Sequence, residues 1–334
     1  MKIAYVPYSP QGKTLVTVQQ AQTIAQDYAR QGYDLTLRQL YYQFVARGLM
    51  PNKQSEYKRL GSIVNDARLG GLLDWNLMVD RTRNIAGGDS SNWDLDEWMQ
   101  ASADQYPMSL WDGIPTRIEV WVEKEALAGV VQRAASAMRV AYFSCRGYVS
   151  QSEMWGAAQR LERHLNADAE KVTILHLGDH DPSGIDMTRD IRERLRMFLS
   201  GDGYDWRRVQ IKRIALNMDQ IRQYNPPPNP AKETDSRFGA YIDRFGDESW
   251  ELDALDPSTL DTLIRGHIAT EMGPEGQERY QERLKERERE RIKLRVLADH
   301  LEDALEQYDD EIQEKLEAYE PERFTELDED TDEE

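Results

Sequence analysis

The sequence predicts an α/β protein, in which a small parallel β-sheet covered by helices lies between a helical N-terminal domain and a helical C-terminal region. Four apolar, strand-like segments alternate with helical segments between residues 117 and 216, and this β-α-β order is typical of parallel sheets. Three helical patterns separated by glycine and proline fill the first 85 residues. The chain ends in a run of mostly acidic side chains.

The composition is that of a globular protein with a highly charged surface. Of the 334 residues, 40% are hydrophobic and 31% are charged, and this length allows two or three modest domains. No apolar run approaches the roughly 20 residues that span a bilayer, and the N-terminus lacks the apolar core of a signal peptide. The single cysteine, Cys145, excludes an internal disulfide framework. We therefore expect a cytoplasmic protein with no membrane partner.

The net charge of −19 is concentrated at one end of the chain. Residues 302–334 hold 17 acidic and 2 basic residues, so residues 1–301 carry a net charge of only −4. Blocks of like charge are usually solvated or disordered, and we expect residues 321–334 to form a disordered acidic tail. The overall acidity therefore does not exclude a DNA-binding face elsewhere.

The N-terminal region, residues 1–90, has the pattern of a winged helix-turn-helix domain. Helices are expected at about 15–30, 37–47 and 55–69, and the segment LLDWNLMVDRTR at 72–83 alternates like a two-stranded wing. The alternative is a plain three-helix bundle.

The third of these helices has two different faces. Leu60, Val64 and Ala67 recur at helical spacing and should pack inward. Another face carries cationic and polar side chains that suit contacts with phosphates and base edges in a major groove. The DNA-binding candidates are Lys58, Arg59, Ser62, Asn65 and Arg68. The alternative is an ordinary solvated helix face.

A loosely structured connector at 91–116 should lead into a Rossmann-like domain at 117–224. Its strands are expected near 117–122, 140–145, 172–177 and 209–216, with helices at 126–138, 152–164 and 185–199 between them.

The C-terminal region, residues 225–320, begins with a proline-rich stretch and ends in a long charged helix. Four prolines within six residues predict an extended loop over 225–237. Further along, apolar residues recur at spacings of four, four, three, four, four and three, which would bury one helix face against the protein's own body or a second copy. They are Leu297, Leu301, Leu305, Tyr308, Ile312, Leu316 and Tyr319.

Three carboxylates follow the ends of predicted strands. Glu123 ends the first strand, and Asp179 and Asp181 in HLGDHDPSG come just after the third. Because ligands of open parallel sheets bind beyond the carboxyl ends of the strands, these side chains should meet at one edge. Hard oxygen ligands of this kind suit Mg²⁺. Zinc on His176 and His180 is a weaker alternative because no cysteine lies nearby, and a simple helix-cap role for Asp181 stays open.

The segments VEKEALAGVV and LGDHDPSGIDM, together with FSCRGY between them, resemble the Toprim domain in the DNA-cleaving chain of topoisomerase VI and its relatives, the Spo11 proteins. A winged helix with a tyrosine nucleophile in an RxxYY context precedes that domain in those proteins, and this chain reads TLRQLYYQF there. The resemblance covers about residues 30–200. It implies Glu123, Asp179 and Asp181 as Mg²⁺ ligands, with Mn²⁺ able to substitute, and Tyr42 as the nucleophile.

The pattern of the helix at 37–47 is compatible with that role for Tyr42. Leu37, Leu40, Tyr41 and Phe44 form its apolar stripe. Tyr42 is turned about 100° from Tyr41 and should point outward. Arg38, four residues before it, could hold a DNA phosphate and favour the phenolate.

The resemblance implies Mg²⁺-dependent cleavage of double-stranded DNA by tyrosine transesterification in a homodimer, as in type IIB topoisomerases. Further candidate phosphate contacts are Arg146, Lys232 and Arg237. The short lead before the first helix suggests that the extension contacting the ATPase subunit is missing. No ATPase motif replaces it, because Pro7 stands where a P-loop needs its first glycine, and a separate ATPase subunit in trans stays open as a partner. Two alternatives stay open: a Toprim nuclease that uses water, and a DNA-binding protein without catalytic activity.

Overall fold

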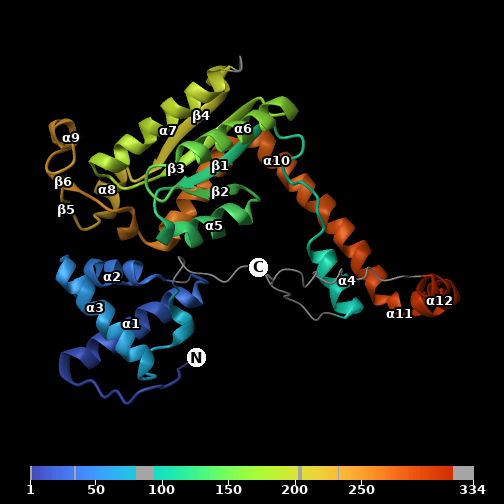
Figure 1. Ribbon diagram of the computed structural model, residues 1–334, viewed down its shortest axis with the longest axis horizontal. Coiled ribbons are helices and arrows are strands. Elements are labelled where there is room, and N and C mark those ends of the chain that lie inside the picture. The colour runs from blue at the N-terminus through green and yellow to red at the C-terminus, as the bar shows by residue number, and fades with distance from the viewer. Residues whose placement is uncertain (1, 34, 80–93, 202–204, 232, 319–334) are drawn as a thin grey trace, which may run out of the picture. The chain divides into compact units, whose positions relative to one another are not determined.

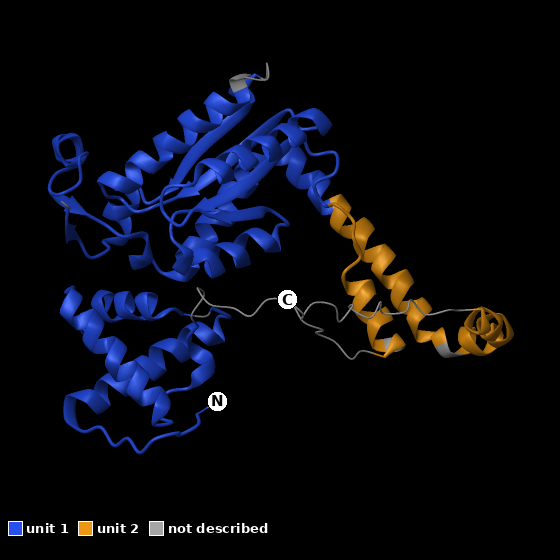
Figure 2. Cartoon of the chain, viewed as in Figure 1, with its two compact units in different colours: residues 1–87, 110–281 blue, residues 88–109, 282–334 orange. Residues whose placement is uncertain are grey.

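A computed structural model describes residues 2–33, 35–79, 94–201, 205–231 and 233–318. The chain divides into two compact units, one of residues 1–87 and 110–281 and the other of residues 88–109 and 282–334 (Figure 2). The candidate phosphate contact Lys232, and the acidic tail expected at 321–334, lie outside the described residues. Every helix in the described part of the chain is too short or too polar to span a bilayer.

The first unit contains a four-stranded parallel sheet, which confirms the α/β prediction. Its strands run in the order β2-β1-β3-β4 (Figure 1). Helices connect them along the chain, because parallel neighbours need a crossover. The strands are β1 (Thr116–Val122), β2 (Ala141–Ser144), β3 (Lys171–Leu177) and β4 (Val209–Ala215), and the connecting helices are α5 (Ala128–Ala137), α6 (Gln151–Ala167) and α7 (Pro182–Gly201).

Both faces of the sheet are covered. Side chains alternate between the faces along a strand, and Val172 and Ile174 of β3 pack in one apolar cluster with residues of α6 and α7. Thr173 points to the other face, where its hydroxyl donates to Glu271 of α10 (Pro257–Asp299) at 3.2 Å. Coverage on both faces explains why β3 is buried along nearly its whole length.

Three helices form the N-terminal part of this unit, as expected. They are α1 (Gly12–Arg30), α2 (Leu37–Ala46) and α3 (Gln54–Leu69). Helix α2 begins at a capping box, in which the Thr36 side chain accepts from the Gln39 backbone and the Gln39 side chain accepts from Thr36. Leu60, Val64 and Ala67 of α3 are buried in the core, as their spacing predicts.

The expected wing is not formed in the described part of its segment, residues 72–79. A 3-10 helix stands at Trp75–Leu77, and the Asp74 side chain caps it by accepting from the Asn76 backbone at 2.9 Å. Met78 then lies parallel to Leu35 in an isolated bridge. The apolar-polar alternation thus reflects a segment that lies against Leu35 and does not fold back on itself here.

The proline-rich segment is also more ordered than the sequence suggests. Within the expected loop, β5 (Asn229–Pro230) pairs antiparallel with β6 (Glu248–Ser249). The Ala231 backbone N–H donates to Asp247 at 2.8 Å, which continues the pairing beyond a proline that has no N–H to give. Helix α8 (Met218–Tyr224) precedes β5 in the chain, and helix α9 (Phe238–Phe245) lies between β5 and β6.

The second unit is helical, and the expected loose connector contributes a helix to it. Asp94 caps α4 (Leu95–Asp104) by accepting from the Glu97 backbone at 2.8 Å. Asp104 at the other end of α4 makes ion pairs with Arg291 and Arg295 of α10, both at 2.5 Å. The chain continues in α11 (Leu301–Gln307) and α12 (Asp309–Glu317).

The apolar stripe near the C-terminus is largely exposed in the described residues. The exposed fractions are 62% for Leu297, 39% for Leu305, 53% for Tyr308 and 60% for Leu316. The described residues of the helical unit therefore leave most of this face uncovered.

Candidate active site

The loop between β3 and α7 carries the two aspartates of the HLGDHDPSG segment. β3 ends at Leu177 and α7 begins at Pro182, so residues 178–181 lie at the carboxyl end of the strand. The loop is closely packed: a Cβ atom on Gly184 would lie 2.2 Å from the carbonyl oxygen of Asp179. Glycine at this position of the DPSG sequence therefore has a steric reason.

Glu123 directly follows β1 and reaches the same loop. Its Oε2 atom accepts from the backbone N–H of Asp179 at 2.9 Å. A Cβ atom on Gly178 would lie 2.8 Å from that oxygen. Burial, and then the nearby charge of Asp179, raise the pKa of Glu123 to about 7.

Both carboxylate oxygens of the buried Asp179 have partners. Oδ1 accepts from the backbone N–H of Leu252 at 2.8 Å, and Oδ2 lies 2.7 Å from the ammonium nitrogen of Lys124. Leu252 begins a 3-10 helix at Leu252–Ala254. Residues remote in the sequence therefore hold this aspartate at the sheet edge.

Asp181 has the helix-cap role that the sequence left open. Its Oδ1 atom accepts from the backbone N–H of Gly184 in the first turn of α7 at 2.7 Å. A carboxylate at a helix N-terminus is favourable because the unpaired N–H groups there carry partial positive charge.

The three carboxylates do not form a metal site in this conformation. The strand ends bring Glu123, Asp179 and Asp181 to one edge, as predicted. Among the described residues, however, no group of three histidine, cysteine or acidic side chains is placed to hold a metal ion. One oxygen each of Glu123 and Asp181 accepts a backbone N–H, and both oxygens of Asp179 have a partner, the Leu252 N–H and Lys124.

Lys124 is the positive charge at the centre of this region. Besides Asp179, its ammonium nitrogen lies 2.9 Å from Glu251 and 3.2 Å from Asp253. Burial alone would lower the pKa of Lys124, but Asp179 and Asp253 outweigh burial and the pKa is raised. We call Lys124, Asp179, Glu251, Asp253 and Arg38 the Lys124 network.

Arg38 extends this network to helix α2. Its Nε atom lies 2.7 Å from Oδ2 of Asp253, the same oxygen that Lys124 approaches, and it also pairs with Glu251. The predicted partner of a DNA phosphate is thus bound to two carboxylates of its own chain.

Tyr42 is buried, so the expectation of an outward-pointing phenol was wrong. It is only 4% exposed and belongs to the same apolar cluster as Tyr41. Burial raises the pKa of Tyr42, and the opposing effects of Arg38 and Lys124 are smaller. The phenolate is therefore not favoured in this conformation. A cavity of about 170 Å³, lined in part by Arg38, Asn229 and Glu251, adjoins the ring.

Arg213 on β4 fixes the shape of the aspartate loop. Its guanidinium donates to the carbonyls of Gly178 and Gly184, both at 2.9 Å, and to that of Asp179 at 2.5 Å. It also donates to the carbonyl of Leu216 and the hydroxyl of Thr188. Burial lowers the pKa of Arg213 to about 10, so it stays charged at neutral pH.

The two histidines near the aspartates belong to no metal-binding group among the described residues. His176 is hydrogen-bonded through Nδ1 to Thr188 at 2.9 Å, and His180 through Nδ1 to Tyr241 at 2.8 Å. Burial lowers the pKa of His176 to about 3 and that of His180 to about 4, so both are neutral at pH 7.

The buried His176 predicts loss of stability in mild acid. In the unfolded chain an imidazole takes up a proton as the pH falls through about 6.5, whereas in the folded protein His176 stays neutral down to about pH 3. The unfolded state then binds more protons, so this contribution to stability is complete above pH 6.5 and is lost as the pH falls. Between pH 7 and pH 5 it amounts to about 2 kcal/mol.

Urea unfolding at pH 7 and pH 5 measures this contribution. The fall in unfolding free energy should be smaller in a His176→Gln protein, whatever its stability at pH 7. His300 is exposed, and the fall in a His300→Gln control should match that of the unaltered protein. An equal fall in all three proteins would contradict the prediction.

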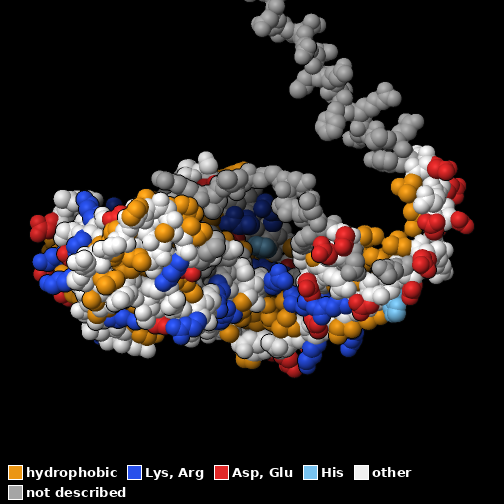
Figure 3. Space-filling view, turned by 90° about the horizontal axis from the view of Figure 1, so that it is seen from below, with side chains coloured by type: hydrophobic (Ala, Val, Ile, Leu, Met, Phe, Trp, Pro, Cys, Tyr) orange, Lys and Arg blue, Asp and Glu red, His pale blue; other side chains and the backbone are white. Residues whose placement is uncertain are grey.

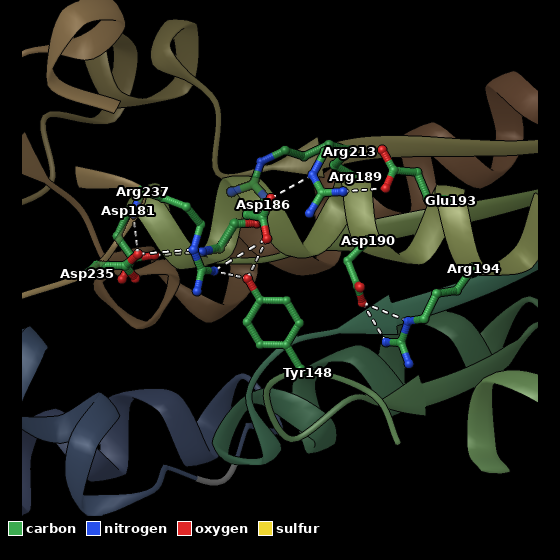
Figure 4. A network of polar contacts seen from close by, with 11 residues as sticks. Tyr148, Asp181, Asp186, Arg189, Asp190, Glu193, Arg194, Arg213, Asp235 and Arg237 are labelled. Carbon is green, nitrogen blue, oxygen red and sulfur yellow. Dashed lines mark hydrogen bonds and ion pairs between the residues drawn. The ribbon is translucent and has the colours of Figure 1, made fainter. Parts of the chain in front are cut away.

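A second set of ion pairs surrounds the start of α7 (Figure 4). The Tyr148 hydroxyl donates to Asp186 at 2.7 Å, and Arg189 pairs with the other oxygen of Asp186 at 2.7 Å. The candidate phosphate contact Arg237 pairs with Asp235 at 3.0 Å and also contacts Tyr148. The network ties the segment before α9 and the loop after β2 to α7.

The other candidate phosphate contacts have varied surroundings. Arg146 is exposed and pairs with Glu125 at 2.8 Å. On α3, Arg59 pairs with Glu56 at 2.6 Å. Arg68 donates to the carbonyl of Trp75 at 2.8 Å and stacks on the Trp75 ring, which is a structural role. The candidates on α3 with exposed side chains are Lys58, Arg59, Ser62 and Asn65.

The chain matches no protein-family model, and no curated protein is significantly similar to it.

Sequence reasoning missed four residues that shape this site. Lys124 stands in the VEKE segment next to Glu123. Its position beside a predicted carboxylate ligand could have identified it as a residue of the site. Arg213 was visible as a charge inside an apolar strand. Glu251 and Asp253 lie outside every motif, and only the folded chain brings them to Arg38 and Lys124.

Proposed function

We propose that this protein cleaves DNA strands by transesterification with Tyr42 as the nucleophile. One observation supports the proposal most: Arg38 on the tyrosine helix and Lys124 at the carboxylate edge share the carboxylates of Glu251 and Asp253. The tyrosine and carboxylate segments of the family resemblance thus belong to one ion network, although they lie far apart in the sequence.

The proposed step exchanges one phosphoester bond for another. The Tyr42 oxygen bonds to a backbone phosphorus while the bond from that phosphorus to the leaving sugar oxygen breaks. The phenol loses its proton and the sugar oxygen gains one. The resemblance implies that the protein stays linked to the 5′ end. Arg38 and Lys124 are the cationic side chains suited to hold the phosphate charge.

Binding of DNA must change the surroundings of Tyr42 in this proposal. The ring is covered, and Arg38 is held by Glu251 and Asp253. A DNA phosphate would replace these carboxylates as the partner of Arg38, because both are anions that accept hydrogen bonds from a guanidinium. Release of Arg38 would also expose the cavity beside the phenol.

Mg²⁺, or Mn²⁺ in its place, remains part of the proposal through the resemblance alone. It would be held by Glu123, Asp179 and Asp181, and it would stabilise charge on phosphate oxygens. In the described conformation these residues do not fit an ion: they form no metal-binding group, and Lys124 lies 2.7 Å from an oxygen of Asp179. We therefore assign no step of the reaction to the metal.

The fold assignments behind this function are part of the proposal. Helices α1–α3 would form the winged-helix domain and the sheet from β1 to β4 a Toprim domain. The exposed side chains of α3 are suited to phosphate and base contacts in a major groove. An ATPase subunit in trans stays a prediction from the resemblance.

A denaturing quench tests the proposal. The protein is incubated with supercoiled DNA and Mg²⁺ or Mn²⁺ and then quenched in detergent. We expect nicked or linear DNA that carries covalently bound protein. Free 5′-phosphate ends without bound protein would identify a nuclease that uses water. Salt-dependent binding without any cleavage would identify a non-catalytic DNA-binding protein.

We also propose that a second copy of the chain covers the exposed stripe of the helical unit. Among the described residues of this unit, eight large apolar side chains are exposed: Leu95, Trp98, Ile292, Val296, Leu297, Leu305, Tyr308 and Leu316. Figure 3 shows hydrophobic side chains between acidic and basic ones on its surface. Residues 283–295 carry a net charge of +4 and residues 301–318 a net charge of −7. A two-fold symmetric, antiparallel contact would therefore pair opposite charges.

Light scattering coupled to size-exclusion chromatography tests this contact. We expect a particle of twice the 38.8 kDa chain mass, and a monomer when Leu297→Lys and Leu316→Lys are combined. Met197→Lys is the matched control, because Met197 is a similarly exposed apolar residue of the first unit. A monomeric unaltered protein, or a double variant that stays dimeric, would contradict the proposal.

A further inference from the structure

The Lys124 ammonium group is surrounded by carboxylates in the way that a bound cation would be. Its nitrogen lies within 3.2 Å of oxygens of Asp179, Glu251 and Asp253. The side chain of Asp253 is fully buried and that of Asp179 is 8% exposed. A buried carboxylate without a positive partner is costly, so the chain supplies a cation of its own at this edge.

The geometry of Asp179 makes this lysine an obstacle to a divalent cation. Oδ1 accepts from the Leu252 backbone N–H and Lys124 lies 2.7 Å from Oδ2, so both oxygens already have a partner. Two cations about 4 Å apart repel each other by several kcal/mol near a protein surface, and more when one is doubly charged. Lys124 and a metal ion therefore compete for Asp179.

We propose that Lys124 is the resident cation of this site and that divalent cations bind Asp179 only by displacing its ammonium group. The proposal rests on the proposed function for the identity of Asp179 as a metal ligand. It does not depend on Tyr42 or on DNA cleavage. The lysine side chain is long and flexible, so it can leave Asp179 while keeping Glu251 or Asp253 as a partner.

Titration calorimetry with Mn²⁺ in the absence of DNA tests the competition. A Lys124→Met protein should bind Mn²⁺ about ten-fold more tightly than the unaltered protein, because the metal no longer has to displace a cation. Without metal, the same variant should unfold at a lower temperature, because carboxylates lose their positive partner. Mn²⁺ should restore its unfolding temperature by more than it raises that of the unaltered protein.

Two controls separate this effect from a general loss of an ion pair. Lys171 pairs with Glu271 at 3.2 Å elsewhere on the sheet, and Lys171→Met should gain no Mn²⁺ affinity. Combining Lys124→Met with Asp179→Asn should abolish the gain, because the carboxylate is gone. Lys124→Gln serves the same test if Lys124→Met does not fold.

Equal or weaker Mn²⁺ binding by the Lys124 variant, or no Mn²⁺ binding by any variant, would overturn the proposal. The denaturing quench gives an independent result for the proposed function. Protein-linked DNA together with unchanged Mn²⁺ affinity would refute the lysine displacement and leave the Tyr42 reaction standing.

Discussion

A Tyr42→Phe protein should form about a thousand-fold less protein-linked DNA than the unaltered protein, or none that is detectable, because the bond-forming oxygen is removed. The substitution keeps the ring in the apolar cluster of α2, so the fold and the binding of DNA should persist. The measurement is covalent adduct after a detergent quench, with DNA binding followed in parallel by fluorescence anisotropy.

Tyr41→Phe provides the matched control for this experiment. Tyr41 is equally buried at 4%, and its hydroxyl accepts from the Lys53 backbone at 2.8 Å, so this variant loses a structural hydrogen bond on the same helix. We expect it to be less stable yet still able to form the adduct. Adduct formation by Tyr42→Phe at the normal rate would exclude Tyr42. The exposed Tyr148 would then be the next residue to test.

Replacement of Arg213 by methionine should lower the free energy of unfolding by about 3 kcal/mol or more. The guanidinium donates to the carbonyls of Gly178, Asp179 and Gly184, and methionine removes all three hydrogen bonds. Its charge also faces Glu123, Asp179 and Asp181, which would repel one another more strongly without it. Urea unfolding of the metal-free protein at pH 7 measures the loss.

Two variants test whether Arg213 stabilises the protein through its hydrogen-bonding geometry or through its charge. Arg213→Lys keeps the charge but lacks the planar fork, so it should recover only part of the stability. Arg207→Ala, on the 3-10 helix at Trp206–Arg208 just before β4, removes an arginine that is 78% exposed and should have no measurable effect. Full stability of Arg213→Met would show that the loop keeps its shape without this residue.

The sheet was predictable because its signal is local. Apolar segments such as VTILHL repeat with helices between them, and parallel strands need such crossovers. The same reasoning predicted that Glu123, Asp179 and Asp181 lie at one edge of the sheet, because each follows the end of a strand.

The local sequence pattern gave wrong expectations where contacts between distant segments decide the structure. The outward direction of Tyr42 was inferred from the faces of a single helix, but the 3-10 helix at Leu252–Ala254 packs against α2 and leaves little of the ring exposed. In the same way, the segment at 72–79 alternates like a strand pair, yet Met78 finds its partner at Leu35, which is far away in the sequence.

The chain by itself determined the order of strands and helices and the delivery of three acidic residues to one sheet edge, because hydrophobic periodicity and strand ends are local properties of a sequence. Only the tertiary structure decided the partners of those acidic residues. Glu251 and Asp253 meet Lys124 and Arg38 through contacts between distant segments. Electrostatic interactions depend on distance in space and on burial, and neither can be read from spacing along the chain.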